Sequence, residues 1–447
     1  MYNEYRKLYS NFIYKKYDIK RDDEYLNITY YFEIEGLEKF NPTIKIENKN
    51  IINYDENIVK TLVFNLGLIE LISYWKCTCS PNVIIECGYL NDEQISWFKK
   101  LYYNGLGEFF YVNKIDTNIN DFMNIKVNCT KKYEYEVSYK PTGNLICVGG
   151  GKDSIVSLEL LKNLDNKAFI VNPKEVTLEC AHISGINDND IIGVKRTIDS
   201  RLIELNKKGF LNGHTPFSSL LAFLSYLTAY LYNREYIILS NENSANESTV
   251  VGTSVNHQYS KTYEFENDFY EYSSKFLKLP IKYFSLLRPL NEYQIAYLFS
   301  SYKKYHKVFK SCNLGSKQNP WVWCCNCPKC LFIYSILSPF LYKDELVSIF
   351  GEDLFNKEEL LETFLELLGR GEHKPFECVG TIDEMNYAIN ETINNLDGEL
   401  PFLLKYFKDN NLNMNVSNPL MEYNNIHNLP QHFESIVKEA LHDREFN

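Results

Sequence analysis

Three glycines followed by lysine, aspartate and serine form the feature of this sequence with the clearest chemical potential. They are Gly149, Gly150, Gly151, Lys152, Asp153 and Ser154. The run follows a short apolar stretch, 144–148, typical of a strand, and precedes an apolar-periodic stretch, 153–164, typical of a helix. Glycines let the backbone approach a phosphate closely, and a helix N-terminus offers free N–H groups. The pattern therefore predicts phosphate binding rather than a simple connecting turn.

The residues around the three glycines indicate which type of phosphate-binding loop this is. A Walker loop needs a further glycine upstream and a Ser or Thr directly after the lysine, where this chain has Ile146 and Asp153. The run instead resembles the PP-loop of N-type ATP pyrophosphatases, usually Ser-Gly-Gly-x-Asp-Ser, with Gly149 in place of the first serine. That resemblance implies that ATP, with Mg²⁺, is cleaved to AMP and pyrophosphate while a substrate oxygen is adenylated.

A second cluster of reactive residues is rich in cysteine. Cys324, Cys327 and Cys330 are spaced Cys-x₂-Cys-x₂-Cys, and Cys312 lies upstream. Four thiolates make a closed tetrahedral Zn²⁺ site, so the spacing predicts one structural zinc. Cys325 is an alternative ligand to Cys324, and a set of reduced, buried cysteines is the alternative to a metal site.

Longer segments resemble one family of enzymes. Between about residues 65 and 385 the chain is similar to MurL-type epimerases of peptidoglycan precursor synthesis. The similar segments are 72–76, 149–154, 198–202, 211–214, 255–261, 264–266, 285–290, 311–313, 323–330 and 373–380. Asn243 departs from the pattern, because a basic residue is expected at that position.

The resemblance implies a reaction. These enzymes use ATP to invert the terminal L-Glu of UDP-MurNAc-L-Ala-L-Glu, and the product passes to downstream Mur ligases. Adenylation cancels the charge of the glutamyl carboxylate and makes the adjacent Cα–H bond much more acidic. A base then removes this proton, another returns on the opposite face, and water cleaves the acyl adenylate. The developing enolate needs electrostatic stabilisation.

Titratable residues within the similar segments are candidates for these roles. The predicted proton carriers are His214, His257, Lys261, His373 and Cys378. The predicted anion-binding residues, for diphosphate or peptide carboxylates, are Arg201, Arg288 and Lys374. For each histidine or cysteine, a purely structural role is the alternative.

The elements that must position these residues fall into three regions. Residues 136–345 alternate strand and helix, which predicts an α/β domain with a doubly wound parallel sheet of PP-loop type. Such sheets bind ligands at the carboxyl ends of their strands. Residues 1–135 form a predicted α+β domain, in which 55–75 and 91–103 are helical and Asn91 or Asp92 caps the second helix. Residues 346–447 are predicted to be helical.

The charge and hydropathy of the sequence argue against nucleic-acid and membrane partners. The 447 residues include 47 Lys and Arg and 58 Asp and Glu, which gives a net charge of −11 and no basic cluster for nucleic acid. The N-terminus has no apolar segment typical of a signal peptide. The apolar stretch 218–232 is too short for a membrane span. We therefore expect a cytoplasmic protein with no nucleic-acid or membrane partner.

Two other functions fit parts of this pattern. One is another PP-loop adenylating enzyme that acts on RNA or a deazaguanine, since 7-cyano-7-deazaguanine synthase has a similar cysteine arrangement. The acidic net charge disfavours an RNA substrate. The other is a nucleotide-binding protein without catalysis, which the intact Lys152, Asp153 and Ser154 disfavour.

Overall fold

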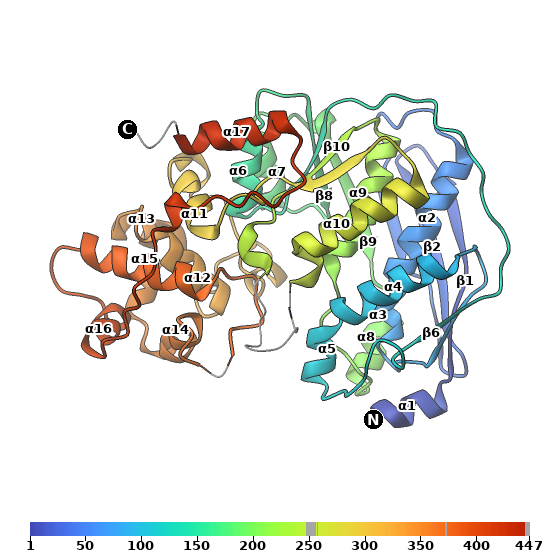
Figure 1. The fold of residues 1–447 in the computed structure, drawn as a ribbon, viewed down its shortest axis with the longest axis horizontal. Coiled ribbons are helices and arrows are strands. Elements are labelled where there is room, and N and C mark those ends of the chain that lie inside the picture. Colours follow the sequence, from blue (N-terminus) through green and yellow to red (C-terminus); the bar gives the residue numbers. More distant parts are fainter. Residues whose placement is uncertain (247–255, 257, 372, 443–447) are drawn as a thin grey trace.

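One mixed sheet extends through the protein, and helices cover it (Figure 1). The computed structural model describes residues 1–246, 256, 258–371 and 373–442. The strands of the sheet are β1 (Asn11–Arg21), β2 (Tyr25–Ile34), β3 (Glu38–Phe40), β4 (Thr43–Glu47), β5 (Asn82–Ile85), β6 (Asn124–Val127), β7 (Asn144–Cys147), β8 (Asn166–Val171), β9 (Ile191–Thr197), β10 (Tyr236–Leu239) and β11 (Lys282–Ser285).

The order of the strands is β11-β10-β7-β8-β9-β4-β2-β1-β5-β6, and β3 pairs with β2. The five strands from β11 to β9 are parallel to one another, as are β1, β5 and β6, whereas β9, β4, β2 and β1 pair antiparallel. The predicted α/β class with a mainly parallel sheet is confirmed. Within the parallel set, the order reverses at β7, because β8 and β9 extend to one side and β10 and β11 to the other.

The helices lie on the faces of the sheet and beside one of its ends. They are α1 (Tyr2–Leu8), α2 (Glu56–Glu70), α3 (Ile72–Trp75), α4 (Asp92–Gly105), α5 (Gly107–Val112), α6 (Lys152–Leu160), α7 (Glu175–Ile183), α8 (Ser200–Lys207), α9 (Phe217–Leu231), α10 (Tyr263–Tyr272), α11 (Glu292–Ser300), α12 (Pro328–Leu337), α13 (Lys343–Phe350), α14 (Leu361–Leu367), α15 (Ile382–Asn395), α16 (Phe402–Asp409) and α17 (Gln431–His442).

Local sequence signals account for the first long helices. Asp55 caps α2 by accepting the N–H of Asn57 at 2.6 Å. Asn91 and Gln94 form a reciprocal capping box at the start of α4, which confirms Asn91 as the cap. Among the described helices, only the stretch Glu56–Trp75 is long and apolar enough to cross a membrane. Its apolar window is 89% buried inside the protein, as in a core helix.

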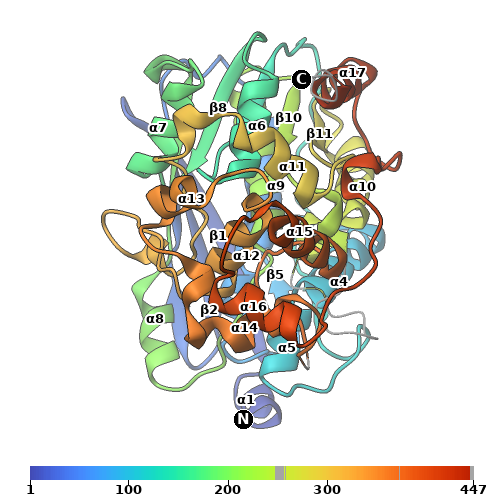
Figure 2. The same cartoon turned by 90° about the vertical axis from the view of Figure 1, so that its left-hand side faces the viewer.

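Helices α12 to α16 form a group at one side of the protein, on the left in Figure 1 and facing the viewer in Figure 2. In its middle, α12 packs against α11, α14 and α15, and the side chains from Lys329 to Leu337 are all buried. The sheet is continuous across residue 135. Helix α12 ends before residue 345 and packs against α14 and α15, which come after it in the sequence. The proposed domain limits at 135 and 345 therefore stay predictions.

Candidate active site

The glycine loop connects β7 to α6, as the sequence predicts. Gly150 has φ +81°, a left-handed conformation that favours glycine. A Cβ on Gly151 would lie 2.6 Å from the Ser311 hydroxyl oxygen, whereas a Cβ on Gly149 would meet no atom within 4 Å. Gly151 is the N-cap of α6, and no side chain caps that helix end. The first N–H groups of α6 therefore remain available to a phosphate.

Buried charges surround this loop. The Lys152 side chain is fully buried and forms ion pairs with Asp153 and with Glu292, the first residue of α11. Burial raises the pKa of Glu292 to about 7. Burial opposes ionisation of Asp153 too, but Lys152 and Lys329 outweigh it and hold the pKa of this carboxyl below its usual value. The loop is thus the centre of an enclosed set of opposite charges.

Two further groups complete this set. Glu242, which follows β10, is 6% exposed, and its carboxylate has no hydrogen-bond or ion-pair partner among the described residues. Burial and the neighbouring Asp153 raise the pKa of Glu242. Lys261 Nζ lies 2.9 Å from the Cys378 sulfur, and Lys329 Nζ donates to the Cys378 carbonyl oxygen. We refer to the charged residues as the charge cluster: Lys152, Asp153, Glu242, Lys261, Glu292 and Lys329.

The strand order explains why the charge cluster forms at this place. Asp153 follows β7, Glu242 follows β10, and Glu292 follows β11, and these three parallel strands are neighbours. Their carboxyl ends meet where the strand order reverses, which is the usual ligand-binding position in open α/β sheets. Residues more than 100 positions apart in sequence are therefore brought together by strand pairing.

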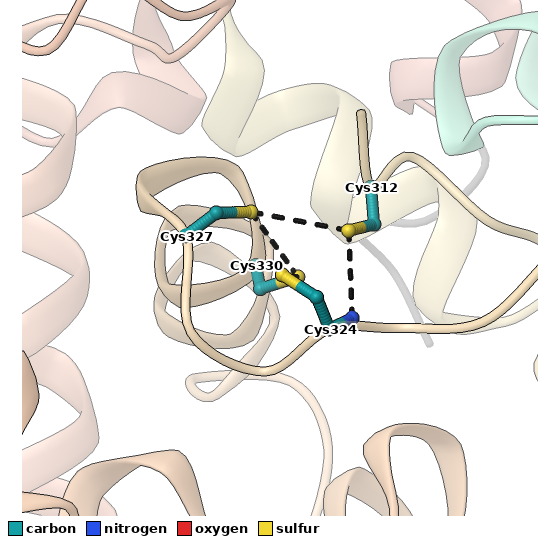
Figure 3. A group of neighbouring side chains, drawn as sticks. All are labelled: Cys312, Cys324, Cys327 and Cys330. Atoms are coloured by element: carbon teal, nitrogen blue, oxygen red, sulfur yellow. Dashed lines mark hydrogen bonds between the residues drawn. The ribbon is translucent and has the colours of Figure 1, made fainter. Parts of the chain in front are cut away.

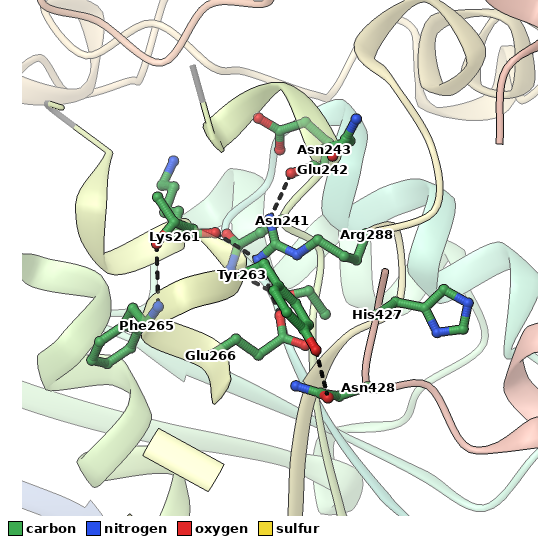
Figure 4. Close-up of polar contacts among 12 residues, drawn as sticks. Asn241, Glu242, Asn243, Lys261, Tyr263, Phe265, Glu266, Arg288, His427 and Asn428 are labelled. Atoms are coloured by element: carbon green, nitrogen blue, oxygen red, sulfur yellow. Dashed lines mark hydrogen bonds and ion pairs between the residues drawn. The ribbon is translucent and has the colours of Figure 1, made fainter. Parts of the chain in front are cut away.

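Arg288 connects the backbones of two members of the charge cluster, Glu242 and Lys261 (Figure 4). Its guanidinium is fully buried and donates to the carbonyl oxygens of Glu242 at 2.7 Å and Lys261 at 2.6 Å. It also forms an ion pair with Glu266 at 3.0 Å. These contacts fix the backbones that carry Glu242 and Lys261. The predicted anion-binding role of Arg288 stays a prediction, beside this evident structural one.

The loop 373–380 brings several predicted residues toward the charge cluster. Cys378 contacts Lys261 directly, as described above. Lys374 is buried and donates to the Gly380 carbonyl oxygen at 2.8 Å. His373 Nδ1 lies 3.1 Å from the Lys374 carbonyl oxygen. Phe376 packs on Tyr111 of α5, with ring centroids 5.6 Å apart. The loop thus connects the charge cluster to α5.

Other predicted residues make their contacts elsewhere. At the start of α8, Arg201 forms an ion pair with Asp199 and donates a hydrogen bond to the side-chain oxygen of Asn41. His214 pairs with Glu108 of α5 at 3.3 Å. Their contacts therefore link other parts of the fold rather than members of the charge cluster. His257 lies outside the described residues.

Sequence reasoning missed three members of the charge cluster: Glu242, Glu292 and Lys329. The sequence does indicate a role for Glu242, because this residue lies three positions after β10 (Tyr236–Leu239). Polar residues that follow parallel strands gather at one edge of the sheet. Lys329 lies between Cys327 and Cys330, and nothing in the spacing of that block indicates a role in a charged site. Glu292 follows β11, a strand that the sequence analysis did not predict.

The predicted metal-binding cysteines do come together (Figure 3). The sulfurs of Cys312, Cys324, Cys327 and Cys330 all lie within 4.8 Å of one another. Cys325 is excluded from this group, because its thiol points to the Phe350 carbonyl oxygen at 3.2 Å. The N–H of Gly315 lies 3.0 Å from the Cys312 sulfur, a contact that favours thiolate. This donor set fits a closed tetrahedral Zn²⁺ site, whose role would be structural.

The four-cysteine group is attached to the glycine loop on two sides. The N–H of Lys310, two residues before Cys312, donates to the Gly150 carbonyl oxygen at 3.0 Å. Lys329, between Cys327 and Cys330, reaches the charge cluster. Fixing the four sulfurs therefore also fixes the backbone behind the loop and one lysine of the site.

We expect about one zinc per chain in purified protein, and we expect Cys327→Ser to lose it. Because structural zinc sites supply on the order of 10 kcal/mol of folding free energy, the variant should melt at a clearly lower temperature. Elemental analysis and thermal unfolding measure both effects. Cys325→Ser is the matched control and should retain its zinc. A metal-free preparation with full activity and unchanged melting would contradict this assignment.

The fold and the site define an α/β protein with an enclosed, highly charged site at the carboxyl ends of parallel strands, the usual place of an active site in such sheets. The chain belongs to the MurL family: the MurL N-terminal domain matches residues 3–286, and the MurL C-terminal domain matches residues 308–413.

Three curated relatives carry the same name, UDP-N-acetyl-alpha-D-muramoyl-L-alanyl-L-glutamate epimerase. The protein from Xanthomonas oryzae pv. oryzae is 33% identical over 336 residues, 72% of each chain. The protein from Micromonospora sp. is 35% identical over 73% of each chain. The protein from Salinispora tropica is 34% identical over 73% of this chain and 71% of its own. No solved structure matches the chain.

Proposed function

We propose that this protein inverts the terminal L-Glu of UDP-MurNAc-L-Ala-L-Glu in an ATP-dependent reaction of peptidoglycan precursor synthesis. The substrate is the one in the names of its relatives. The observation that carries the ATP dependence is the position of the glycine loop beside the buried charge cluster. The reversal of strand order at β7 supports a doubly wound sheet of PP-loop type.

ATP serves this reaction by activating the glutamyl carboxylate. We place the phosphates of ATP on the glycine loop and the N-terminus of α6, with Lys152, Lys261 and Lys329 facing their negative charge. Asp153 and Glu242 are the residues that would hold Mg²⁺, which screens the phosphate charge when bound. Transfer of AMP to the carboxylate releases pyrophosphate and leaves an acyl adenylate whose α-proton is acidic enough to remove.

Cys378 and Lys261 are the groups best placed to carry that proton. The ammonium at 2.9 Å from sulfur favours the thiolate, which is the basic form of cysteine. A thiolate at this position takes the Cα proton and becomes a thiol, and a second group returns a proton on the opposite face. His373, on the same loop, is one candidate for the second group; His214 and His257 remain others.

The proposed reaction indicates in which compartment and with which partners the protein acts. The reaction needs ATP and a reduced Cys378, so we place the protein in the cytoplasm, with no membrane or nucleic-acid partner. The D-Glu product would pass to downstream Mur ligases. We propose no function for the substitution at Asn243, whose side-chain oxygen accepts from Asn424 at 3.0 Å.

The direct test is product analysis. The protein is incubated with ATP, Mg²⁺ and UDP-MurNAc-L-Ala-L-Glu, and nucleotides and the chirality of Glu are measured together. We expect AMP, pyrophosphate and D-Glu to appear in step. ADP and phosphate as products, or AMP without inversion, would contradict the proposed function. In the second case another acceptor of the adenylate would have to be identified.

A further inference from the structure

A pocket lies beyond the end of β9, between α3, α8 and the start of α9. Its walls are mainly apolar and include Ile198, Leu202 and Phe217, whose ring is 46% exposed. Its polar lining residues are Ser73, Lys76, Arg196, Asn206, Asn212 and Thr215. None of these residues belongs to the charge cluster, so the pocket is a separate candidate site.

Lys76 supplies a buried positive charge at this pocket. It is 6% exposed, and its ammonium donates to the neutral Thr215 hydroxyl at 2.7 Å and to the Gly213 carbonyl oxygen. No carboxylate in the described chain lies within ion-pairing distance of it. Glu70, a carboxylate buried nearby, is paired with Arg196 at 2.8 Å. A buried ammonium without a counter-ion is costly, and an anionic ligand would offset that cost.

Asn206 supplies an unsatisfied acceptor to the same pocket. Its side-chain oxygen is buried and has no hydrogen-bond donor in the part of the chain that the structure describes. Leaving such an acceptor unpaired is unfavourable. A ligand that presents an N–H group beside a flat apolar surface would satisfy the acceptor and cover the exposed ring of Phe217.

The pocket lies at the same edge of the sheet as the glycine loop. Strands β7, β8 and β9 are parallel neighbours, so β9 is about 10 Å from β7 at the usual strand spacing. A chain of contacts also joins the two sites through α5. Phe376 packs on Tyr111, and Glu108 pairs with His214, which lies between the two residues that accept from Lys76. The two sites therefore face the same edge of the sheet, as one elongated substrate would require.

We infer that this pocket binds the uridine diphosphate end of the substrate, with the uracil N3–H donated to Asn206 and the diphosphate beside Lys76. The identity of the substrate rests on the proposed function, whereas the preference for an anionic nucleotide with an N–H donor rests on the pocket itself. Uracil donates at N3, whereas the N3 of cytosine is an acceptor that would face the Asn206 oxygen, so the pocket should prefer UDP to CDP.

Calorimetric titration with UDP and CDP tests this inference without requiring turnover. Lys76→Met should weaken UDP binding at least about 10-fold, equivalent to about 1.4 kcal/mol. Asn206→Leu should bring UDP and CDP to similar affinity. Lys208→Met, at the exposed end of α8, is the matched control and should bind UDP as the unmodified protein does. Thermal unfolding identifies any variant that fails to fold.

Three results would overturn the inference: equal UDP affinity in folded Lys76→Met, no UDP/CDP preference in the unmodified protein, or competition between UDP and ATP for one site. In turnover assays, Lys76→Met should raise KM for the nucleotide-linked substrate and leave KM for ATP unchanged. UDP binding at this pocket in a protein that forms no AMP would refute the proposed function alone. AMP formation and inversion without UDP binding would refute this inference alone.

Discussion

Asp153→Asn is expected to reduce the formation of AMP from ATP by about 100-fold or more. Asp153 is the carboxylate of the glycine loop, and its side chain is 27% exposed, so a ligand can reach it. Lys152 and Lys329 keep it ionised. Asparagine has the same shape but no charge, which removes the proposed Mg²⁺ contact. Pyrophosphate release and chromatography of AMP measure the effect.

The control for this variant is Asp165→Asn. Asp165 is 63% exposed and pairs with Arg234 at 2.8 Å, at the other end of the same helix–strand unit. Its loss should leave AMP formation unchanged. Both variants should unfold cooperatively near the melting temperature of the unmodified protein, because Lys152 keeps Glu292 as its partner. AMP formation by Asp153→Asn at the unmodified rate would refute the assignment of the glycine loop as the ATP site.

Cys378→Ala is expected to slow the inversion of Glu by about 10²–10⁴-fold, the usual contribution of a general acid or base. The variant should still form AMP, because the glycine loop and its neighbouring lysines are intact. A chiral assay of Glu beside an AMP assay separates the two steps. Lys261→Met should also slow inversion, since the Lys261 ammonium favours the thiolate of Cys378. Unlike Cys378→Ala, it should lower AMP formation too, because the same ammonium faces the proposed phosphate site.

Cys129→Ser serves as the control for Cys378→Ala. Cys129 is partly buried like Cys378 and lies after β6, in the N-terminal part of the sheet. We expect it to retain full activity. Inversion at the unmodified rate in Cys378→Ala would exclude Cys378 as a proton carrier. The remaining candidates among the described residues would then be Lys261, His214 and His373.

The features that sequence predicts best are local ones. The glycine loop lies between a strand and a helix as predicted, because glycine spacing and apolar runs are encoded within about 20 residues. The cysteine group forms because three of its members lie within seven residues of one another, and α12 starts between them. Spacing alone left Cys324 and Cys325 as alternatives, and only the direction of the Cys325 side chain decides between them.

Features that depend on strand pairing were not predictable in this way. The sequence contains no signal that β4 pairs antiparallel with β9 and so joins two parallel sets of strands in one sheet. Short strands such as β6 and β11 have only four residues each, and unlike β7 they are not followed by a glycine motif that marks their ends. Glu242 and Glu292 join the charge cluster only because β10 lies beside β7 and β11 lies beside β10. Arg201 contacts other groups because it follows β9, which lies two strands away on the other side of β7.

The central claim is that adenylation by ATP serves to make the Cα–H bond of the terminal Glu exchangeable. The measurement that tests it most directly is the reaction in heavy water, with mass analysis of Glu and quantification of AMP in the same samples. We expect each D-Glu product to carry one deuterium at Cα, in step with AMP formed. D-Glu that retains its original hydrogen, or that forms without AMP, would contradict the claim.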